Sequence, residues 1–484
     1  MTDLADLSAT ELRRLIGTKA VSPVEVMQAA LTRIDMVNPA VNAVVTLDAD
    51  AGIAGAKRAE EAVMAGEELE PLHGLPVAVK DLENTAGMRT TQGSLLYEHH
   101  IPQDDDAMVA NVRQAGGIVF AKTNTPEFGA GANTTNRVFG PTGNPFDPRL
   151  TSAGSSGGSA VVLATGMSPL ATGSDMGGSL RTPAGFCGVV GFRPSPGLVP
   201  DASSTAALSP FGVLGPMGRT VEDAYLLLRA QLDYDLRDPY SSPAALGAPD
   251  HLGAVDLSTI RAAFSPDLGK APVDHGIRET FLRRAKSFSH VFRSAEWGEP
   301  AFPDVHEVFE VLRAIGFVAA FETALATKRD RLNRFVIDGT ERGLKYTMAD
   351  VARAHAKQTI LYRDFLDFFD DHDVLICPAA TVSPFPHAEP YVKAINGEVL
   401  ANYTSWLALA YCPTMALAAS CVIPCGLDHK GLPFGIQVVG PKGSDLLVLE
   451  VAHALEQVLA RNAETKRPVP DLGRLAEAER LGLG

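Results

Sequence analysis

Two serines, placed at the two ends of the window 155–179, lie in the glycine-rich segments best suited to covalent chemistry. The segments read GSSGGS at 154–159 and GSDMGGSLRTPAGFCG at 173–188, with few charges around them. Glycine lets backbone N–H groups crowd close to a ligand atom. A row of such N–H groups is what a developing oxyanion needs, and a serine beside it can act as a nucleophile. The pattern therefore predicts covalent acyl transfer.

A lysine at the end of an apolar run is a candidate base. The run Leu75-Pro76-Val77-Ala78-Val79 is typical of a buried strand, and Lys80 and Asp81 follow it directly. Desolvation there disfavours the charged amine, which lowers its pKa toward the range useful for a base. Because neighbours along a strand face opposite sides, we expect Asp81 to point away from Lys80.

The first glycine segment allows other interpretations. It matches G-x-S-x-G with Ser156 in the centre, but a nucleophile elbow needs a strand directly before it, and residues 144–149 are predicted to be a loop. A phosphate-binding loop would need a Gly-Lys-Ser/Thr sequence, which is absent. Taken alone, the segment could also be a flexible surface turn. The second glycine segment and the strand-end lysine favour the catalytic interpretation.

Asp175 and Arg181 flank the second glycine segment. The pair could brace this turn, or could be an exposed ion pair that contributes little. Histidine is the usual base for a serine nucleophile, but none of the twelve histidines has a convincing partner motif. No HExxH or zinc-type cysteine spacing occurs, so no metal site is predicted.

Composition limits the class of protein. The 484 residues carry a formal net charge of −15, which argues against nucleic acid or an anionic membrane as the main partner. Five scattered cysteines and an N-terminus without a signal-peptide pattern favour a cytoplasmic protein. Residues 399–427 carry no charge, yet Pro413 and Pro424 would break a spanning helix, so we expect a buried helix, a turn and a core strand there.

Strands and helices alternate along the chain, which predicts an α/β fold with a mixed twisted sheet covered by helices on both faces. No linker divides residues 1–484, so we expect a single large domain with a peripheral inserted subregion at about 234–300 and a weakly structured tail at 466–484. The main predicted strands are 41–47, 75–79, 118–121, 169–172, 189–192, 260–264, 373–377 and 421–423. The main predicted helices are 22–36, 49–65, 105–115, 159–164, 220–228, 304–327, 348–370 and 445–461.

From about Asp6 to Leu455, and most densely at 73–230, the chain resembles the amidase signature family, whose members use a Ser–Ser–Lys triad. GLPVAVKDL resembles the lysine strand of the family, which implies that Lys80 is the base. The resemblance places Ser155 at a cis peptide as the proton relay and makes Ser179 the nucleophile. It implies an oxyanion hole formed by the backbone N–H groups of Met176, Gly177, Gly178 and Ser179, with support from Ser156, Asp175 and Arg181.

The resemblance implies a serine amidase that needs no cofactor and cleaves small, apolar or aryl amides. Alternatives are a carbamate (urethane) or aryl ester hydrolase, the amidase subunit of a glutamine-dependent tRNA amidotransferase, and a non-catalytic ligand-binding protein on the same fold. The amidotransferase subunit uses an acid near its late Pro-x-Gly, and residues 404–423 contain none. We expect a monomer or homodimer that acts on a small molecule.

Two departures from the family pattern affect the expected pocket. Ala153 stands where the family usually has glycine, which is tolerable unless that position needs a positive φ. Residues 417–420 replace a common Gly-x-Pro-Ala turn. An apolar stripe on the helix at 304–327 could wall an acyl pocket or could simply be core. Its members are Val308, Phe309, Leu312, Phe317 and Phe321.

Overall fold

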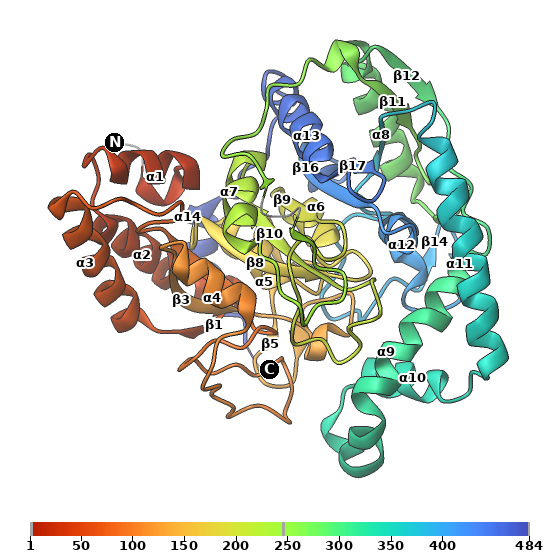
Figure 1. The fold of residues 1–484 in the computed structure, drawn as a ribbon, viewed down its shortest axis with the longest axis horizontal. Helices are drawn as coiled ribbons and strands as arrows, with labels where there is room; N and C mark the ends of the chain where they lie inside the picture. The colour runs from red at the N-terminus through yellow and green to blue at the C-terminus, as the bar shows by residue number, and fades with distance from the viewer. Residues whose placement is uncertain (1–2, 244–246, 483–484) are drawn as a thin grey trace.

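A mixed β-sheet runs through the centre of the protein (Figure 1). The structure, a computed structural model, describes residues 3–243 and 247–482. Within these residues the sheet has 11 strands in the order β1-β3-β2-β8-β10-β9-β16-β17-β13-β11-β12. They are β1 (Val44–Leu47), β2 (Pro76–Lys80), β3 (Ile118–Thr123), β8 (Leu170–Asp175), β9 (Val190–Arg193), β10 (Val213–Gly218), β11 (Arg261–Phe264), β12 (Ser294–Trp297), β13 (Val374–Pro378), β16 (Ala419–Leu427) and β17 (Pro433–Gly440).

Helices and short hairpins surround this sheet. The helices are α1 (Ala9–Gly17), α2 (Pro23–Val41), α3 (Ala49–Ala65), α4 (Ala107–Gln114), α5 (Gly157–Ala164), α6 (Arg181–Cys187), α7 (Val221–Gln231), α8 (His275–Phe288), α9 (Val305–Lys328), α10 (Arg334–Gly343), α11 (Met348–Phe368), α12 (Ala408–Met415), α13 (Asp445–Ala460) and α14 (Leu472–Ala476). The hairpin strands are β4 (Thr135–Asn136), β5 (Gly140–Pro141), β6 (Gly143–Asn144), β7 (Asp147–Thr151), β14 (Ala394–Ile395) and β15 (Glu398–Val399).

Both faces of the sheet are covered, which confirms the predicted α/β class. Successive residues of a strand point to opposite faces. Val77 and Val79 of β2 belong to the core cluster that includes α7 and α13, whereas Ala78 belongs to the cluster that includes α5 and α6. The two clusters therefore lie on opposite faces of one sheet, and the chain forms a single large α/β domain.

Most predicted elements occur close to their predicted positions, and the deviations have packing causes. Helix α2 runs through Pro39 to Val41, beyond the predicted end near residue 36, because its last turns are buried. The strand predicted from residue 41 consequently starts at Val44. Strand β10 and helices α8 and α10 were not predicted. The uncharged stretch forms α12, a turn and β16, as predicted.

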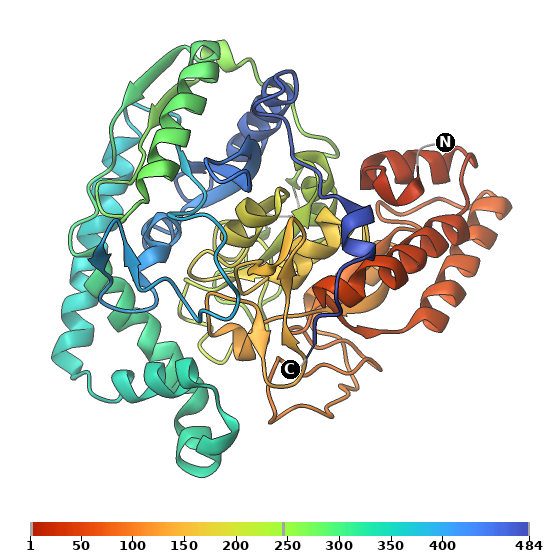
Figure 2. The ribbon, with the colours of Figure 1, turned by 180° about the vertical axis from the view of Figure 1, so that it is seen from behind.

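The subregion predicted to be a peripheral insertion and the tail predicted to be weakly structured both contact the main fold. Strands β11 and β12 of the 234–300 region extend the edge of the central sheet through parallel pairing with β13. Residues 244–246 of that region, and 483–484 of the tail, lie outside the described residues. Helix α14 of the tail packs against α2 from the opposite end of the chain, as Figure 2 shows. Among the described helices, none is long and apolar enough to cross a membrane.

The parallel pairing of β2 with β8 creates the setting for the candidate site. The two strands pair only at Val77–Leu170 and Ala78–Ala171. Beyond these pairs, the carboxyl ends of both strands lie at the same edge of the sheet. In α/β sheets, ligands bind in the crevice outside such carboxyl ends.

Candidate active site

Lys80 ends β2 with its amine among three serine hydroxyls. Its side chain points to the α5–α6 face, as the alternation with Ala78 requires, and is completely buried. Its Nζ lies 2.8 Å from the hydroxyl of Ser155, 2.9 Å from that of Ser156 and 2.8 Å from that of Ser174. These contacts bring together the lysine strand and both glycine segments.

The charge of Lys80 is destabilised by its surroundings. Burial lowers the pKa of Lys80 to about 8, and the carboxylates of Glu83 and Asp175 partly oppose that shift. None of the described carboxylates forms an ion pair with Lys80. Asp81 faces away, as expected, and accepts hydrogen bonds from the N–H and hydroxyl of Thr91.

A buried carboxylate that was not predicted acts on the charge of Lys80. Burial raises the pKa of Glu83 to about 7, against the opposing effect of Lys80 and Lys122. Both carboxylate oxygens of Glu83 lack a hydrogen-bond partner among the described residues. Lys122 is also buried, but its Nζ donates to the main-chain carbonyl of Glu83 and to the hydroxyl of Thr85.

The first glycine segment presents Ser155 to the cavity through an unusual backbone path. The Gly154–Ser155 peptide is cis, as the family resemblance implied. Ala153 has a φ of 60°, so this alanine occupies the left-handed region that favours glycine. Ser156 is fully buried and is not among the residues that line the cavity, so its position does not favour the nucleophile-elbow interpretation.

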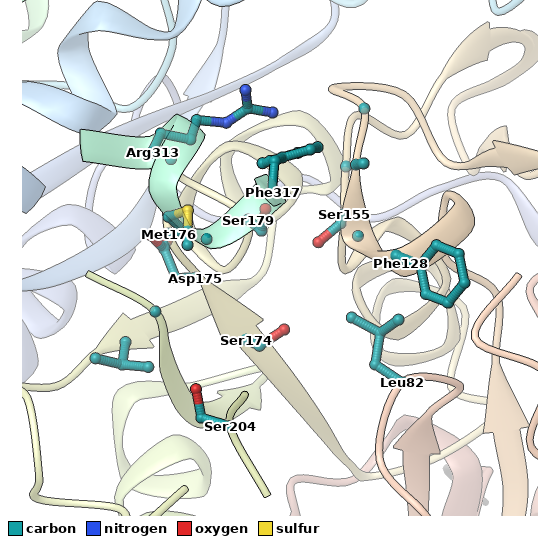
Figure 3. Close-up of a pocket in the computed structure, with 18 of the residues that line it drawn as sticks. Leu82, Phe128, Ser155, Ser174, Asp175, Met176, Ser179, Ser204, Arg313 and Phe317 are labelled. Carbon is teal, nitrogen blue, oxygen red and sulfur yellow. The ribbon is translucent and has the colours of Figure 1, made fainter. Parts of the chain in front are cut away.

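The second glycine segment places Ser179 in the turn between β8 and α6. Its side chain is half-buried and lines the cavity. Figure 3 shows the hydroxyls of Ser155 and Ser179 on either side of one open space. Within the described part of the chain, no hydrogen bond joins these two hydroxyls. Catalytic hydrogen bonds of this kind often tighten only when substrate binds.

Three of the four predicted oxyanion donors have free N–H groups. The N–H groups of Met176, Gly177 and Ser179 find no acceptor in residues 3–243 or 247–482. Gly178 has a φ of 111°, and its N–H donates to the Asp175 carboxylate at 3.0 Å. In this structure, three N–H groups are therefore available to an oxyanion, those of Met176, Gly177 and Ser179.

Asp175 and Arg181 form a fully buried brace, not a surface ion pair. Arg181 donates to both carboxylate oxygens of Asp175, at 3.0 and 2.9 Å. Arg193, which was not predicted, donates to the Asp175 carbonyl at 2.6 Å. Leu180 N–H also donates to the carboxylate. The brace holds the turn between β8 and α6 that carries Ser179.

A cavity of about 350 Å³ opens in front of these groups. Phe309, Phe317 and Phe321 of α9 line it, so part of the predicted apolar stripe faces the cavity, whereas Val308 and Leu312 belong to the core. Arg313, which was not predicted, also lines it. The spacing of four from Phe309 to Arg313 to Phe317 is the sequence signal that could have identified it. None of the described histidines lines this cavity.

Comparison with known proteins identifies the family. The Amidase family profile matches residues 25–449. The chain belongs to this family. It is 31% identical to the acylamidase of Rhodococcus erythropolis, over 96% of this chain and 98% of that protein. It is also 31% identical to a glutamyl-tRNA(Gln) amidotransferase subunit of Carboxydothermus hydrogenoformans, over 97% of this chain and 100% of that protein.

Solved structures agree with this assignment. A bacterial aryl acylamidase of the amidase signature family has a TM-score of 0.85 and 27% identity, over 93% of this chain and 96% of that one. A second amidase structure has a TM-score of 0.82 and 28% identity, over 93% of this chain and 100% of that one. The chain has the amidase signature fold and is an amidase, a hydrolase that acts on amides.

Proposed function

We propose that this amidase hydrolyses small, apolar or aryl amides through an acyl-enzyme on Ser179, with Ser155 as the proton relay and Lys80 as the base. One observation carries the proposal. Among the described residues, the buried Lys80 amine forms hydrogen bonds only with hydroxyls, and one of these, that of Ser155, shares a cavity with Ser179. A lysine held in this way can be neutral near neutral pH and can accept a proton.

The proposed reaction has two halves. The Ser179 oxygen attacks the amide carbonyl while its proton passes through Ser155 to neutral Lys80. The free N–H groups of Met176, Gly177 and Ser179 hold the oxyanion. The C–N bond then breaks as Ser155 protonates the leaving amine. Water attacks the acyl ester, gives its proton to the same relay and releases the carboxylic acid, which restores the Ser179 hydroxyl.

The substrate class rests on the walls of the cavity. Three phenylalanine rings of α9 offer an apolar surface, and the relatives include an acylamidase and an aryl acylamidase. A carbamate or aryl ester would undergo the same acyl transfer and is the nearest alternative. We expect a cytoplasmic monomer or homodimer, in line with the scattered cysteines.

A second candidate is the amidase subunit of a glutamine-dependent tRNA amidotransferase. Several glutamyl-tRNA(Gln) amidotransferase subunits are 30–32% identical to this chain, which favours it. The absence of an acidic residue from 404–423 argues against glutamine as the substrate. Purified chain that hydrolyses no amide alone, but gains glutaminase activity with a partner subunit, would decide for this candidate.

The central experiment combines turnover with labelling. We expect the purified chain to hydrolyse members of a panel of amides, anilides and carbamates, and to release a burst of one amine per chain from a slow substrate. A fluorophosphonate should label Ser179 in mass spectra, and Ser179→Ala should abolish both turnover and label. Ser204→Ala, which alters another cavity-lining serine, is the matched control and should keep activity. Label on Ser156 would contradict the proposal.

A further inference from the structure

The α9 wall of the cavity carries a cation that the proposed reaction does not use. Arg313 lies one helical turn from Phe309 and from Phe317, and all three line the cavity. Figure 3 shows Arg313 near Met176, at the end of the cavity opposite Leu82 and Ser204. Ser179 lies between these two ends. A substrate bound at Ser179 would therefore extend toward Arg313 on one side.

Arg313 has no acidic partner among the residues that the structure describes. Within residues 3–243 and 247–482 no carboxylate forms an ion pair with it. The carboxylate of Glu310, one turn earlier on α9, instead accepts hydrogen bonds from Arg342 and from the hydroxyl of Thr404. A half-buried guanidinium without a counter-charge has lost part of its hydration and gains most from an anionic ligand.

Neighbouring rings hold the Arg313 guanidinium in place. Its central carbon lies 4.3 Å from the ring centroid of Phe317 and 5.3 Å from that of Tyr403, and one terminal nitrogen donates to the Tyr403 hydroxyl. The other donors of the guanidinium have no acceptor among the described residues. A planar fork that is already oriented matches the geometry of a carboxylate.

The opposite end of the cavity has the opposite charge. Asp106, whose carboxylate accepts a hydrogen bond from the N–H of Asn84 close to Leu82, and Asp201, three residues before Ser204, line it. Neither of these carboxylates has a basic partner in an ion pair within the described residues. An anionic group on a substrate would be repelled there and attracted to Arg313, which would fix the orientation of the substrate.

We propose that Arg313 binds a carboxylate on the substrate, so that this enzyme prefers amides with an apolar body and a remote carboxylate over neutral amides of the same shape. The proposal rests on the proposed function and narrows its substrate class. The carboxylate accepts hydrogen bonds from the free donors of Arg313 while Ser179 attacks the amide carbon.

Two matched substrate pairs test this preference. The 4-nitroanilide of glutaric acid is compared with that of pentanoic acid, and 4-acetamidobenzoate with 4-acetamidobenzamide. The first pair places the carboxylate on the acyl side and the second on the amine side. We expect kcat/KM to be roughly 10–100-fold higher for the acid of at least one pair, as for hydrogen bonds to a charged group. Arg313→Gln should abolish this preference, because it removes the charged donors that the acid would use.

Two controls isolate the charge of Arg313. Arg334 also stacks on an aromatic ring, 4.7 Å from the centroid of Phe335, but does not line the cavity, so Arg334→Gln should keep the preference. Arg313→Lys keeps the charge but lacks the planar fork, so this variant should retain only part of the preference for acids. Added salt should weaken the preference of the parent enzyme.

A binding measurement separates this inference from the proposed function. Calorimetry with Ser179→Ala should show 4-acetamidobenzoate, glutarate mono-4-nitroanilide or both binding roughly 10–100-fold more tightly than the neutral partners, and Arg313→Gln in that background should abolish the difference. Equal binding of acids and neutral partners to Ser179→Ala would overturn the inference. Neutral amides that turn over without any preference for acids would also overturn it, while leaving the proposed function intact. Absence of all turnover, with the binding difference present, would defeat the proposed function alone.

Discussion

Two buried charged groups beside the end of β8 are stabilised in opposite ways. Burial alone would raise the pKa of Asp175, but Arg181, with help from Arg193, lowers it to about 2. Burial also lowers the pKa of Lys80 to about 8, and no ion pair with another described residue compensates for this burial. Paired charges stay charged across the physiological range, whereas an amine surrounded by hydroxyls can change its charge.

The difference separates a structural role from a chemical one. A buried ion pair holds a turn in one geometry, and breaking it leaves a charge without a partner. A buried amine among hydroxyls can gain or lose a proton at modest cost, because a hydroxyl can both donate and accept a hydrogen bond. In this enzyme the brace at Asp175 orients Ser179, and the amine of Lys80 can serve as the base.

The largest effect should follow from removing the titrating amine. Lys80→Met should lower kcat/KM by roughly 10³-fold or more, because no base remains. Lys80→Arg should be equally inactive, because a guanidinium keeps its proton. Lys122→Met removes a second buried lysine, one that donates to a carbonyl and to Thr85, and should stay within about tenfold of the parent. Steady-state kinetics on an anilide measure these effects. An active Lys80→Arg enzyme would show that Lys80 contributes only charge or packing.

The largest effect on stability should come from removing the charge of Asp175, the group that is held in an ion pair. Asp175→Asn leaves two buried guanidinium groups without a counter-charge and should lower the free energy of unfolding by about 3–5 kcal/mol. Urea titration with two independent probes measures the change. Lys80→Met should be as stable as the parent at pH 7, or more stable. If Lys80→Met were the less stable of the two variants, the contrast between the two groups would be wrong.

The cost of burying Lys80 should depend on pH. The native pKa is about 8, and the unfolded value is about 10.4. Between these values the unfolded chain holds a proton that the native chain lacks, so the free energy of unfolding rises with pH. Below pH 8 the full cost, about 3 kcal/mol, is present. The stability advantage of Lys80→Met should therefore be largest near pH 7 and shrink toward pH 10, as urea titrations at several pH values would show. A constant difference would mean that Lys80 is not neutralised in the native state.

Local sequence patterns were enough for much of the fold and for the first members of the site. Alternation and apolar runs predicted β2 and its terminal lysine, and helix α3 has the predicted bounds. Ser174 could not be ranked, because its nearness to Lys80 depends on which strand pairs with β2. Glu83 follows Lys80 by only three residues, but its burial, which raises its pKa, depends on the rest of the fold. Arg193 joins Asp175 only through the order of the central strands. Such contacts join segments far apart in the sequence, and local periodicity says nothing about them.

The smallest expected effect concerns the tuning of Lys80 by Glu83. The Glu83 carboxylate raises the pKa of Lys80 against the larger effect of burial, without forming an ion pair with it. Glu83→Gln keeps the shape of the side chain and removes its charge, so the pKa of Lys80 should fall further. The proposed mechanism requires the neutral amine, so kcat/KM should rise with pH through a midpoint near 8 in the parent and through a midpoint lower by about 0.5–1 unit in the variant. At pH 7 the variant should therefore be several-fold faster, with little change at the alkaline plateau.

The adjacent acid supplies the matched control for this shift. Asp81 is bonded to Thr91 and is not among the charges that act on Lys80, so Asp81→Asn should leave the midpoint in place. A full pH–rate profile is needed, because a change in kcat at one pH would not distinguish a shifted midpoint from a distorted site. A midpoint that moves upward in Glu83→Gln, or moves equally in both variants, would show that the charge of Glu83 does not act on Lys80. The pKa of Lys80 would then be set by burial and by the hydroxyls around the amine.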